Sequence, residues 1–339
     1  MRCAPLWQAS RSPMPPTWSN LTFTGVGAFA GTGNSGNNVV TGGSGGDVLD
    51  GRAGDDMLIG GDGNDRLTGG AGADVLSGGA GDDIADYSAS AVAVTVDLTT
   101  GIVSGGDAAG DTLISIEKVI GSNLADNLSS ATSGHVLQGG AGNDVYMIGD
   151  VGVSITEFGG EGTDEVRTDL ASFALADAAN VENLVFTGTG DFAGTGNGGN
   201  NFIVGGSGDD TIDGQAGDDI LTGGIGNDFL FGGDGDDMLS FAGTGFAFGG
   251  EGSDVYDIAA ASGIVYVNET GLYGIDTVLL NAQDASDVEF FRVGDDLHFT
   301  NKADMSDGVQ NAGVVLTDWF DGAANVETFV TADGLHFLI

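Results

Sequence analysis

The stretch from Gly42 to Asp86 repeats with a period of nine residues and no slippage. It reads as five lines: GGSGGDVLD, GRAGDDMLI, GGDGNDRLT, GGAGADVLS and GGAGDDIAD. Position six is Asp in every line, and position eight is apolar in every line. Four further lines with the same pattern begin at Gly205. A strict short period is typical of a fold in which one small unit is stacked on copies of itself.

These lines resemble the GGxGxDxUx nonapeptide of RTX proteins, also called haemolysin-type calcium-binding proteins. The resemblance covers roughly residues 20–339 and implies an all-β fold with calcium-binding parallel β-roll arrays. In this family each line is a turn plus a short strand, and two lines make one 18-residue coil. Lines two apart then stack about 4.8 Å from one another. Calcium takes oxygen ligands at about 2.3 to 2.6 Å, so we expect ions between lines two apart.

The residue types at each position fit this arrangement. Glycine reaches positive φ cheaply, which a tight turn requires, and a short Asp side chain can reach an ion from that turn. The position-eight side chain fills a thin interior. A flexible glycine-rich linker is the alternative, but a linker has no reason to keep Asp and Leu in phase. The expected calcium ligands are Asp47, Asp56, Asp65, Asp74, Asp83, Asp126, Asp144, Asp210, Asp219, Asp228, Asp237 and Asp254.

The charge balance points to the same kind of ligand. Eight Lys and Arg face 50 Asp and Glu, which gives a formal net charge of -42. This excess argues against nucleic acid or an anionic membrane as partner, because both attract positive patches. It suits many divalent cations, and without them we expect repulsion to keep the chain expanded. Cys3 is the single cysteine, so stability does not come from internal disulfides. No apolar run approaches the ~18 residues of a transmembrane helix.

The remainder of the chain is organised around the arrays. Alternating segments such as AVAVTVDL and TLISIEKVI predict strands with one buried face. Asp126 lies in a degenerate line. The line GGAGNDVYM supplies Asp144, 18 residues after Asp126. The predicted segments are a disordered lead (1–19), a first β-roll array (20–86), a β spacer (87–120), a short degenerate roll (121–147), a second β spacer (148–187), a second β-roll array (188–257) and a C-terminal β segment (258–339).

An internal duplication relates residues 20–51 to residues 183–214, without gaps. The second copy is preceded by LADAANVE and the first by the proline-rich lead, so we expect the first unit to be cut off upstream. Both copies open with a line that carries Asn at position six, Asn38 and Asn201. A neutral amide is a weaker ligand, so these lines are predicted to be capping turns.

Two further departures from the period carry predictions. Asp254 follows Asp237 by 17 residues, which predicts a bulge or a cap. Tyr146 and Tyr256 stand at position eight, which suggests that the interior opens onto the β segment that follows each of them.

The C-terminal segment resembles the β-rich part that closes many haemolysin-type proteins. The resemblance rests on the W-F-x-G sequence at 319–322 and on A-D-G at 332–334. It implies an uncleaved secretion signal, export as an unfolded chain through a type I secretion apparatus, and folding in external calcium.

Motifs of catalysis are weak in this chain. GTGNSG at 31–36 and GTGNGG at 194–199 match G-x-G-x-x-G, but no helix pattern follows to bind a pyrophosphate. Ser44 matches G-x-S-x-G, but it lies at position three of a repeat line. His135, His298 and His336 have no metal-ligand spacing, and His135 is a degenerate turn residue. We therefore expect no enzymatic activity.

Three functions are compatible with the sequence. The first is a non-enzymatic calcium-binding module of a secreted bacterial protein, located outside the cell or on its surface. The second is the carrier region of a secreted protease, lipase or polysaccharide-modifying enzyme whose catalytic domain is missing. The third is an adhesin or surface-layer protein that calcium makes rigid. The sequence identifies no protein partner beyond the secretion apparatus implied by the resemblance.

Overall fold

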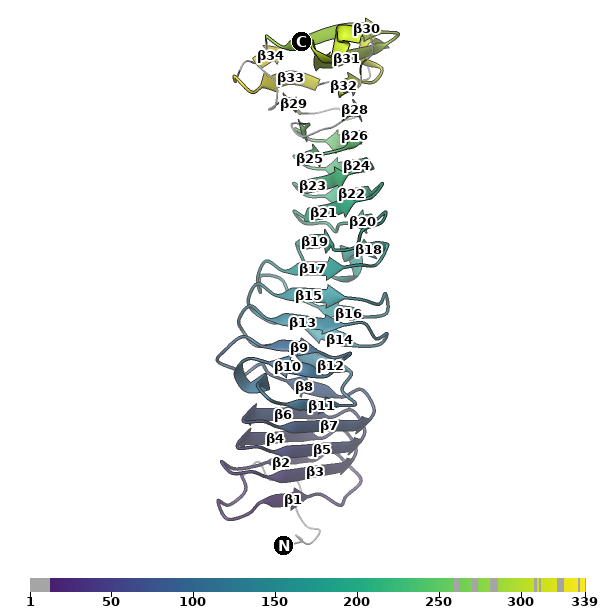
Figure 1. Cartoon of the computed structure of the whole chain (residues 1–339). Coiled ribbons are helices and arrows are strands. Elements are labelled where there is room, and N and C mark those ends of the chain that lie inside the picture. The colour runs from purple at the N-terminus through teal and green to yellow at the C-terminus, as the bar shows by residue number, and fades with distance from the viewer. Residues whose placement is uncertain are drawn as a thin grey trace. The chain divides into compact units, whose positions relative to one another are not determined.

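The computed structural model describes residues 13–258, 263–269, 274–280, 286–307, 310, 312–321, 326–334 and 336–338. The chain forms two compact units, Met1–Val166 and Arg167–Ile339. Both consist of short stacked strands (Figure 1), and helix is confined, in the described ranges, to short 3-10 segments. These segments are η1 (Gly106–Ala108), η2 (Leu175–Asp177), η3 (Asp304–Asp307) and η4 (Trp319–Asp321). The expected all-β solenoid is therefore confirmed. No helix of the described ranges is both long and apolar enough to span a membrane.

The first unit is a stack of parallel strands. Its strands are β1 (Asn20–Thr22), β2 (Ala30–Thr32), β3 (Val39–Ser44), β4 (Val48–Ala53), β5 (Met57–Asp62), β6 (Arg66–Ala71), β7 (Val75–Ala80), β8 (Ile84–Asp86), β9 (Thr95–Asp97), β10 (Ile102–Ser104), β11 (Thr112–Ile114), β12 (Lys118–Ile120), β13 (Asn127–Ser130), β14 (Val136–Gln138), β15 (Val145–Ile148) and β16 (Ser154–Thr156). β17 (Glu165–Thr168) contains the boundary between the units. One sheet has the order β1-β3-β5-β7-β11, and a second has the order β16-β14-β12-β8-β6-β4-β2.

Consecutive lines of the first array alternate between these two sheets, so each strand pairs with the strand two lines away. Leu58 in β5 is in register with Val40 in β3 and with Leu76 in β7. Position-eight side chains of both sheets point inward and are fully buried, as Leu49 of β4 and Leu58 of β5 are. The two-line, 18-residue coil of a β-roll is thus present, with a core to which each line contributes one position-eight side chain.

The segment predicted as a spacer, 87–120, continues this stack. β11 pairs in parallel with β7, and β12 pairs in parallel with both β8 and β14. The segment differs from the array through an antiparallel pair, β9 with β10, and through η1. The predicted strands therefore exist, and they add coils to the roll.

The lead predicted to be disordered is ordered where the structure describes it, from residue 13 onward. The backbone N–H of Met14 donates to the carbonyl of Thr32 at 3.1 Å, and the Met14 side chain is buried. The side-chain amide of Asn34 donates to the carbonyls of Pro15 and Trp18. The first coil thus offers backbone and amide partners that hold residues 13–19 against its open end. Residues 1–12 of the predicted lead lie outside the described residues.

The second unit repeats the parallel stacking. Its strands are β18 (Ser172–Ala174), β19 (Asn183–Phe186), β20 (Ala193–Thr195), β21 (Phe202–Ser207), β22 (Thr211–Ala216), β23 (Ile220–Ile225), β24 (Asn227–Asp234), β25 (Met238–Phe241), β26 (Thr244–Glu251), β27 (Val255–Asp257), β28 (Ile264–Val267), β29 (Asp276–Leu280), β30 (Val288–Val293), β31 (Asp296–Asn301), β32 (Gly313–Leu316), β33 (Val326–Thr331) and β34 (His336–Leu338). The register between β23 and β25 shifts between Thr222 and Gly224. This irregularity confirms the predicted bulge.

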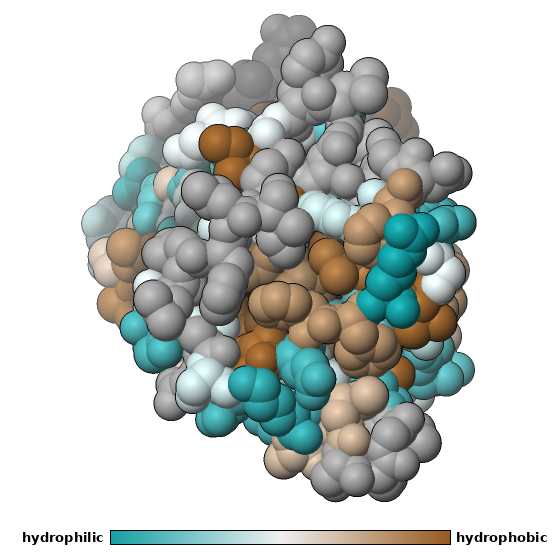
Figure 2. Space-filling view, turned by 90° about the horizontal axis from the view of Figure 1, so that it is seen from above, coloured by the Kyte–Doolittle hydropathy of each residue, from teal (hydrophilic) through white to brown (hydrophobic). Residues whose placement is uncertain are grey.

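Antiparallel pairing distinguishes the C-terminal segment from the arrays. β31 pairs antiparallel with both β30 and β32, and β33 pairs antiparallel with β34. Trp319 and Phe320 lie in η4, whereas Gly322 of the W-F-x-G sequence is outside the described residues. Phe290 and Phe320 are exposed. The view from above mixes apolar and polar surface over its coloured part (Figure 2).

Candidate metal sites

All twelve predicted aspartates are buried. Asp65 is 1 % exposed and Asp228 is 0 % exposed, and the other ten lie between these values or at 2 %. Position six has the same parity as position eight along the line, so its side chain turns to the inside of the roll as the leucine does. A buried carboxylate is costly unless it is hydrogen-bonded and its charge is balanced. Each of these side chains therefore needs both a hydrogen-bond donor and a positive partner.

One oxygen of each carboxylate is satisfied by the neighbouring coil. The backbone N–H of Asp47 donates to Oδ1 of Asp65 at 2.7 Å, and the N–H of Asp65 donates to Oδ1 of Asp83 at 2.8 Å. In the second array, the N–H of Asp219 donates to Oδ1 of Asp237 at 2.8 Å. This ladder joins lines two apart and fixes the orientation of every carboxylate. The other oxygen, Oδ2, is left pointing away from the ladder.

The Oδ2 atoms form a buried row without hydrogen-bond partners. Among the described residues, eleven of the twelve predicted aspartates have such an atom: Asp47, Asp56, Asp65, Asp74, Asp83, Asp144, Asp210, Asp219, Asp228, Asp237 and Asp254. Asp126 is the exception, because the backbone N–H of Ser122 donates to its Oδ2. Satisfied buried polar atoms are the rule in proteins, so a whole row of exceptions points to a missing partner.

A glycine at position one makes room beside each Oδ2. A methyl group placed on Gly60 would lie 2.1 Å from Oδ2 of Asp65 and 2.7 Å from the carbonyl oxygen of Gly78. The same convergence occurs over Gly232, where the methyl would lie 2.2 Å from Oδ2 of Asp237 and 2.5 Å from the Gly249 carbonyl oxygen. We call each such space, bounded by Oδ2 and a carbonyl of the coil two lines on, a cradle. Its oxygens are the hard ligands that calcium prefers.

The electrostatics of the row indicate that positive charge is lacking. Burial raises the pKa of Asp65 to about 6, against the lowering effect of the hydrogen bond from Asp47. Burial likewise raises the pKa of Asp237 to about 8, and the carboxylates of Asp254 and Asp219 add to the rise. These are the shifts expected where like charges are stacked in a poorly solvated interior. A cation in the cradles would reverse their direction.

The two asparagine lines each occupy the first rung of one ladder in their array. The N–H of Asn38 donates to Oδ1 of Asp56 at 2.7 Å, and the N–H of Asn201 donates to Oδ1 of Asp219 at 2.7 Å. The amide oxygen of Asn38 in turn accepts from the N–H of Asn34. His135, in contrast, bonds Ser130 Oγ through Nδ1.

Four acidic residues that the sequence analysis missed complete the ladders. The N–H of Asp74 donates to Oδ1 of Asp111 at 2.8 Å, and the N–H of Asp83 donates to Oε2 of Glu117 at 2.9 Å. Asp144 and Asp254 donate in the same way to Asp164 and Asp276, each at 2.8 Å. Each missed residue precedes an apolar residue by two positions, for example Asp111 before Leu113. This triplet, an Asp or Glu followed two positions later by an apolar residue, is the sequence signal that remains where the preceding glycines are absent.

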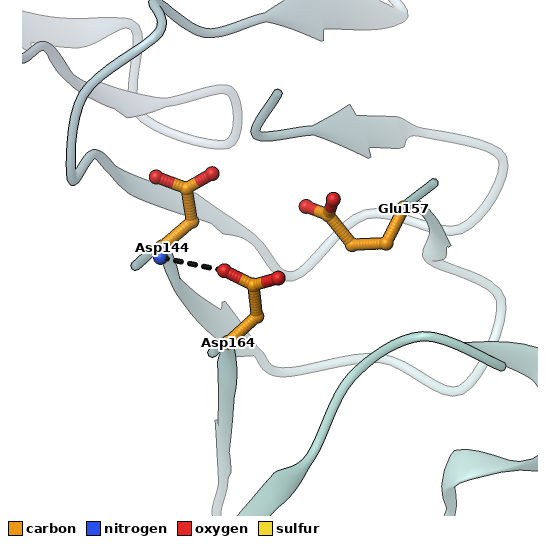
Figure 3. A group of neighbouring side chains, drawn as sticks. All are labelled: Asp144, Glu157 and Asp164. Atoms are coloured by element: carbon orange, nitrogen blue, oxygen red, sulfur yellow. Dashed lines mark hydrogen bonds between the residues drawn. The ribbon is translucent and has the colours of Figure 1, made fainter. Parts of the chain in front are cut away.

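Two further glutamates bring three carboxylates together. Among the described residues, Asp144, Glu157 and Asp164 form one buried group, and Asp254, Glu269 and Asp276 form another. In each group one oxygen from every side chain lies within 4.8 Å of the others. Figure 3 shows the carboxylate of Glu157 directed toward those of Asp144 and Asp164. Burial and the neighbouring carboxylates of Asp164 and Asp144 raise the pKa of Glu157 to about 8.

The comparison with protein families agrees with the repeat geometry. The family model described as RTX calcium-binding nonapeptide repeat (4 copies) matches residues 32–67, 59–89, 132–149, 195–230 and 216–245. The matches cover the regular lines from Gly42 to Asp86 and from Gly205 to Ser240, together with the line of Asp144. The comparison with curated proteins gives no match.

Proposed function

We propose, since this chain carries RTX calcium-binding nonapeptide repeats, that it is a non-enzymatic calcium-binding β-roll that acquires its fold when it meets external calcium. The eleven position-six aspartates with an unpartnered Oδ2 are the proposed ligands, and carbonyl oxygens of the coil two lines on complete cradles such as those over Gly60 and Gly232. When bound, calcium supplies the positive charge that the buried carboxylates lack. The chain's own part is to hold those oxygens in place through the backbone ladder.

One observation carries this proposal: the row of buried Oδ2 atoms without hydrogen-bond partners, each facing a space that a glycine keeps open. A purely structural carboxylate would use both oxygens, as that of Asp126 does with Ser122. A catalytic carboxylate would face a substrate cleft, whereas these side chains are at most 2 % exposed. Their burial in register on successive coils supports a structural metal and no catalytic role.

Circular dichroism of the whole chain tests the coupling between calcium and folding. In excess chelator we expect little β signal, because like charges are buried without compensation. Calcium added to about 0.1 to 1 mM, the range of extracellular modules, should produce the β signal. Magnesium should substitute poorly, because it demands a tighter octahedron and loses its water reluctantly. An equal β signal in chelator and in calcium would contradict the proposal.

The cellular part of the proposal is export by a type I secretion apparatus, with residues 258–339 containing the signal. Support comes from the small apolar core of the roll, to which each ordinary line contributes one position-eight side chain, and from the net charge of -42. Such a chain stays unfolded where calcium is scarce and is competent for passage as a polypeptide. Co-expression with such an apparatus, with and without residues 258–339, tests it. Equal amounts of both chains in the medium would contradict the proposed signal.

A further inference from the structure

The two three-carboxylate groups occupy equivalent places in their units, although different lengths of chain build them. Asp144 and Asp164 are 20 residues apart, whereas Asp254 and Asp276 are 22 residues apart. The first aspartate of each group lies in a line with Tyr at position eight. This line is GGAGNDVYM for Asp144 and GGEGSDVYD for Asp254. Two independent occurrences of one arrangement indicate a built feature of the fold.

The glutamate of each group takes the place that a position-one glycine has in an ordinary line. β14 pairs with β16 so that Gln138 is opposite Thr156, and the next residue of each strand is Gly139 or Glu157. β26 pairs with β28 so that Ala247 is opposite Val267, and Gly249 and Glu269 each follow this pair by two residues. In the arrays, the glycine at this register offers a backbone carbonyl to the cradle. Here a charged side chain is available instead.

A tyrosine positions that glutamate. The N–H of Gly139 donates to the hydroxyl oxygen of Tyr146 at 2.7 Å, and the same hydroxyl donates to Oε1 of Glu157. In the second unit, the N–H of Gly249 donates to the Tyr256 hydroxyl at 3.1 Å, and the hydroxyl donates to Oε2 of Glu269. The tyrosine hydroxyl thus accepts from the glycine and donates to the glutamate, which fixes the position of the glutamate side chain. A leucine at position eight could not make this link.

An unpartnered oxygen is aimed at the same point. Asp144 is 1 % exposed, and its Oδ2 has no hydrogen-bond partner. A methyl on Gly139 would meet this Oδ2 at 2.0 Å and the Tyr146 hydroxyl at 2.4 Å. A methyl on Gly249 would meet Oδ2 of Asp254 at 2.1 Å and the Tyr256 hydroxyl at 2.3 Å. The cradle, the aspartate and the tyrosine-bound glutamate thus converge in both units.

We propose that each group is a calcium site of a second kind, in which a glutamate carboxylate held by tyrosine replaces the glycine carbonyl of the ordinary cradle. We refer to these as the closing sites. The inference rests on the proposed function for the identity of the cation. Calcium affinity rises with the number of charged ligands and with the rigidity of the site. A closing site has three carboxylates and a fixed glutamate, so it binds calcium more tightly than the cradles and fills first.

The test uses the whole chain and calcium alone. Glu157→Gln and Glu269→Gln remove one charge each, keep the side-chain length and leave an amide oxygen for the tyrosine. Glu251→Gln removes the same charge from an exposed side chain in the line that contains Asp254, and it is the matched control. Calcium retained after gel filtration in buffered calcium of about 10 µM, well below the range of extracellular modules, is counted by metal analysis. We expect two ions for the wild type and the control, one for each single variant and none for the double variant.

A second measurement applies if the double variant does not fold. Terbium, which binds calcium sites, is added to the wild-type chain and to the Tyr146→Phe/Tyr256→Phe variant, which keeps all six carboxylates. Tyrosine-excited emission should appear with the first two equivalents in the wild type and be lost in the variant. In a calcium titration of the tyrosine variant, the dissociation constants of the two tightest ions should rise on the order of tenfold.

The outcomes separate this inference from the proposed function. Equal retention of calcium by the wild type and the double variant would overturn the closing sites. The three carboxylates of each group would then share protons and would not hold an ion. Emission that is unchanged in the tyrosine variant would overturn them as well. A wild-type chain that binds only weak ions keeps the proposed function and refutes the closing sites. A wild-type chain that binds no calcium at millimolar concentration refutes both.

Discussion

Gly60→Ala fills the cradle of Asp65 and also presses on the backbone of the neighbouring coil. The φ angle of Gly60 lies outside the left-handed region, so an alanine is acceptable to the backbone. Its methyl group, however, would lie 2.1 Å from Oδ2 of Asp65 and 2.7 Å from the carbonyl oxygen of Gly78. Ordinary carbon–oxygen contacts are longer than 3 Å, so the methyl occupies the space proposed for the ion. Leu58 and Leu67, the neighbouring core residues, are untouched.

The loss is the binding free energy of the cradle. A ligand that binds only the folded state stabilises it by about 1.4 kcal/mol at ten times Kd and by about 2.7 kcal/mol at one hundred times Kd. Extracellular calcium modules have Kd values of about 0.1 to 1 mM, so 10 mM calcium spans this range. We therefore expect Gly60→Ala to lose at least about 1.4 to 2.7 kcal/mol of stability in 10 mM calcium, to which the contact with the Gly78 carbonyl adds.

The assay is urea unfolding at 10 mM calcium together with metal analysis of the folded protein. Gly27→Ala is the control, because a methyl on Gly27 meets no atom within 4 Å. The control should keep the stability and calcium content of the wild type, and Gly60→Ala should hold at least one ion fewer. If Gly60→Ala matched Gly27→Ala in both measurements, the cradle would not be the metal site.

Three further predictions use other parts of the roll. Leu58→Ala should cost about 2 to 5 kcal/mol in denaturant unfolding with calcium present, because Leu58 is fully buried and the truncation leaves a cavity; a cost below about 1 kcal/mol would contradict this core. Gly61→Ala should prevent the first array from forming β signal in calcium, because Gly61 has φ of 117° and a methyl there would lie 2.1 Å from the Gly43 carbonyl oxygen; a wild-type titration curve would refute this. In chelator, β signal should rise as the pH falls from 7 to 4. Burial raises the folded-state pKa of Asp65 and Asp74 to about 6 from 3.8, so the folded chain binds more protons in this window and loses stability as pH rises through it; a flat signal would refute the linkage.

The resemblance to RTX repeats implied the coil, and the period of nine located the apolar face and the twelve aspartates, because both depend on strict register. The period failed where insertions separate rungs of one ladder. Asp74 bonds Asp111 at a separation of 37 residues, and Asp83 bonds Glu117 at a separation of 34, so a search at 18 passes over both. The strand pairing restores the register in space, since Leu113 lies opposite Leu76.

The repeat pattern also did not predict which carboxylate oxygen faces each cradle. The sequence places an Asp at position six, but only the backbone geometry decides that Oδ1 accepts from the previous coil and Oδ2 remains for an ion. This division gives each aspartate one oxygen for the cradle, whereas the simple stacking argument treats the carboxylate as available to both sides. Glu157 has no periodic signal, because its role depends on its register opposite Gly139 and on the hydroxyl of Tyr146.

On the proposed function, the same residues make the roll unstable without cations and stable with them. Each ordinary line buries one apolar side chain at position eight and one carboxylate at position six, as Leu67 and Asp65 show. The apolar burial favours folding in any solution, but the carboxylate opposes it whenever its charge is uncompensated. Because the two contributions come from the same line, lengthening the array increases both together and does not relieve the dependence on cations. A longer roll is therefore a steeper calcium switch, since more carboxylates must be neutralised in one cooperative stack.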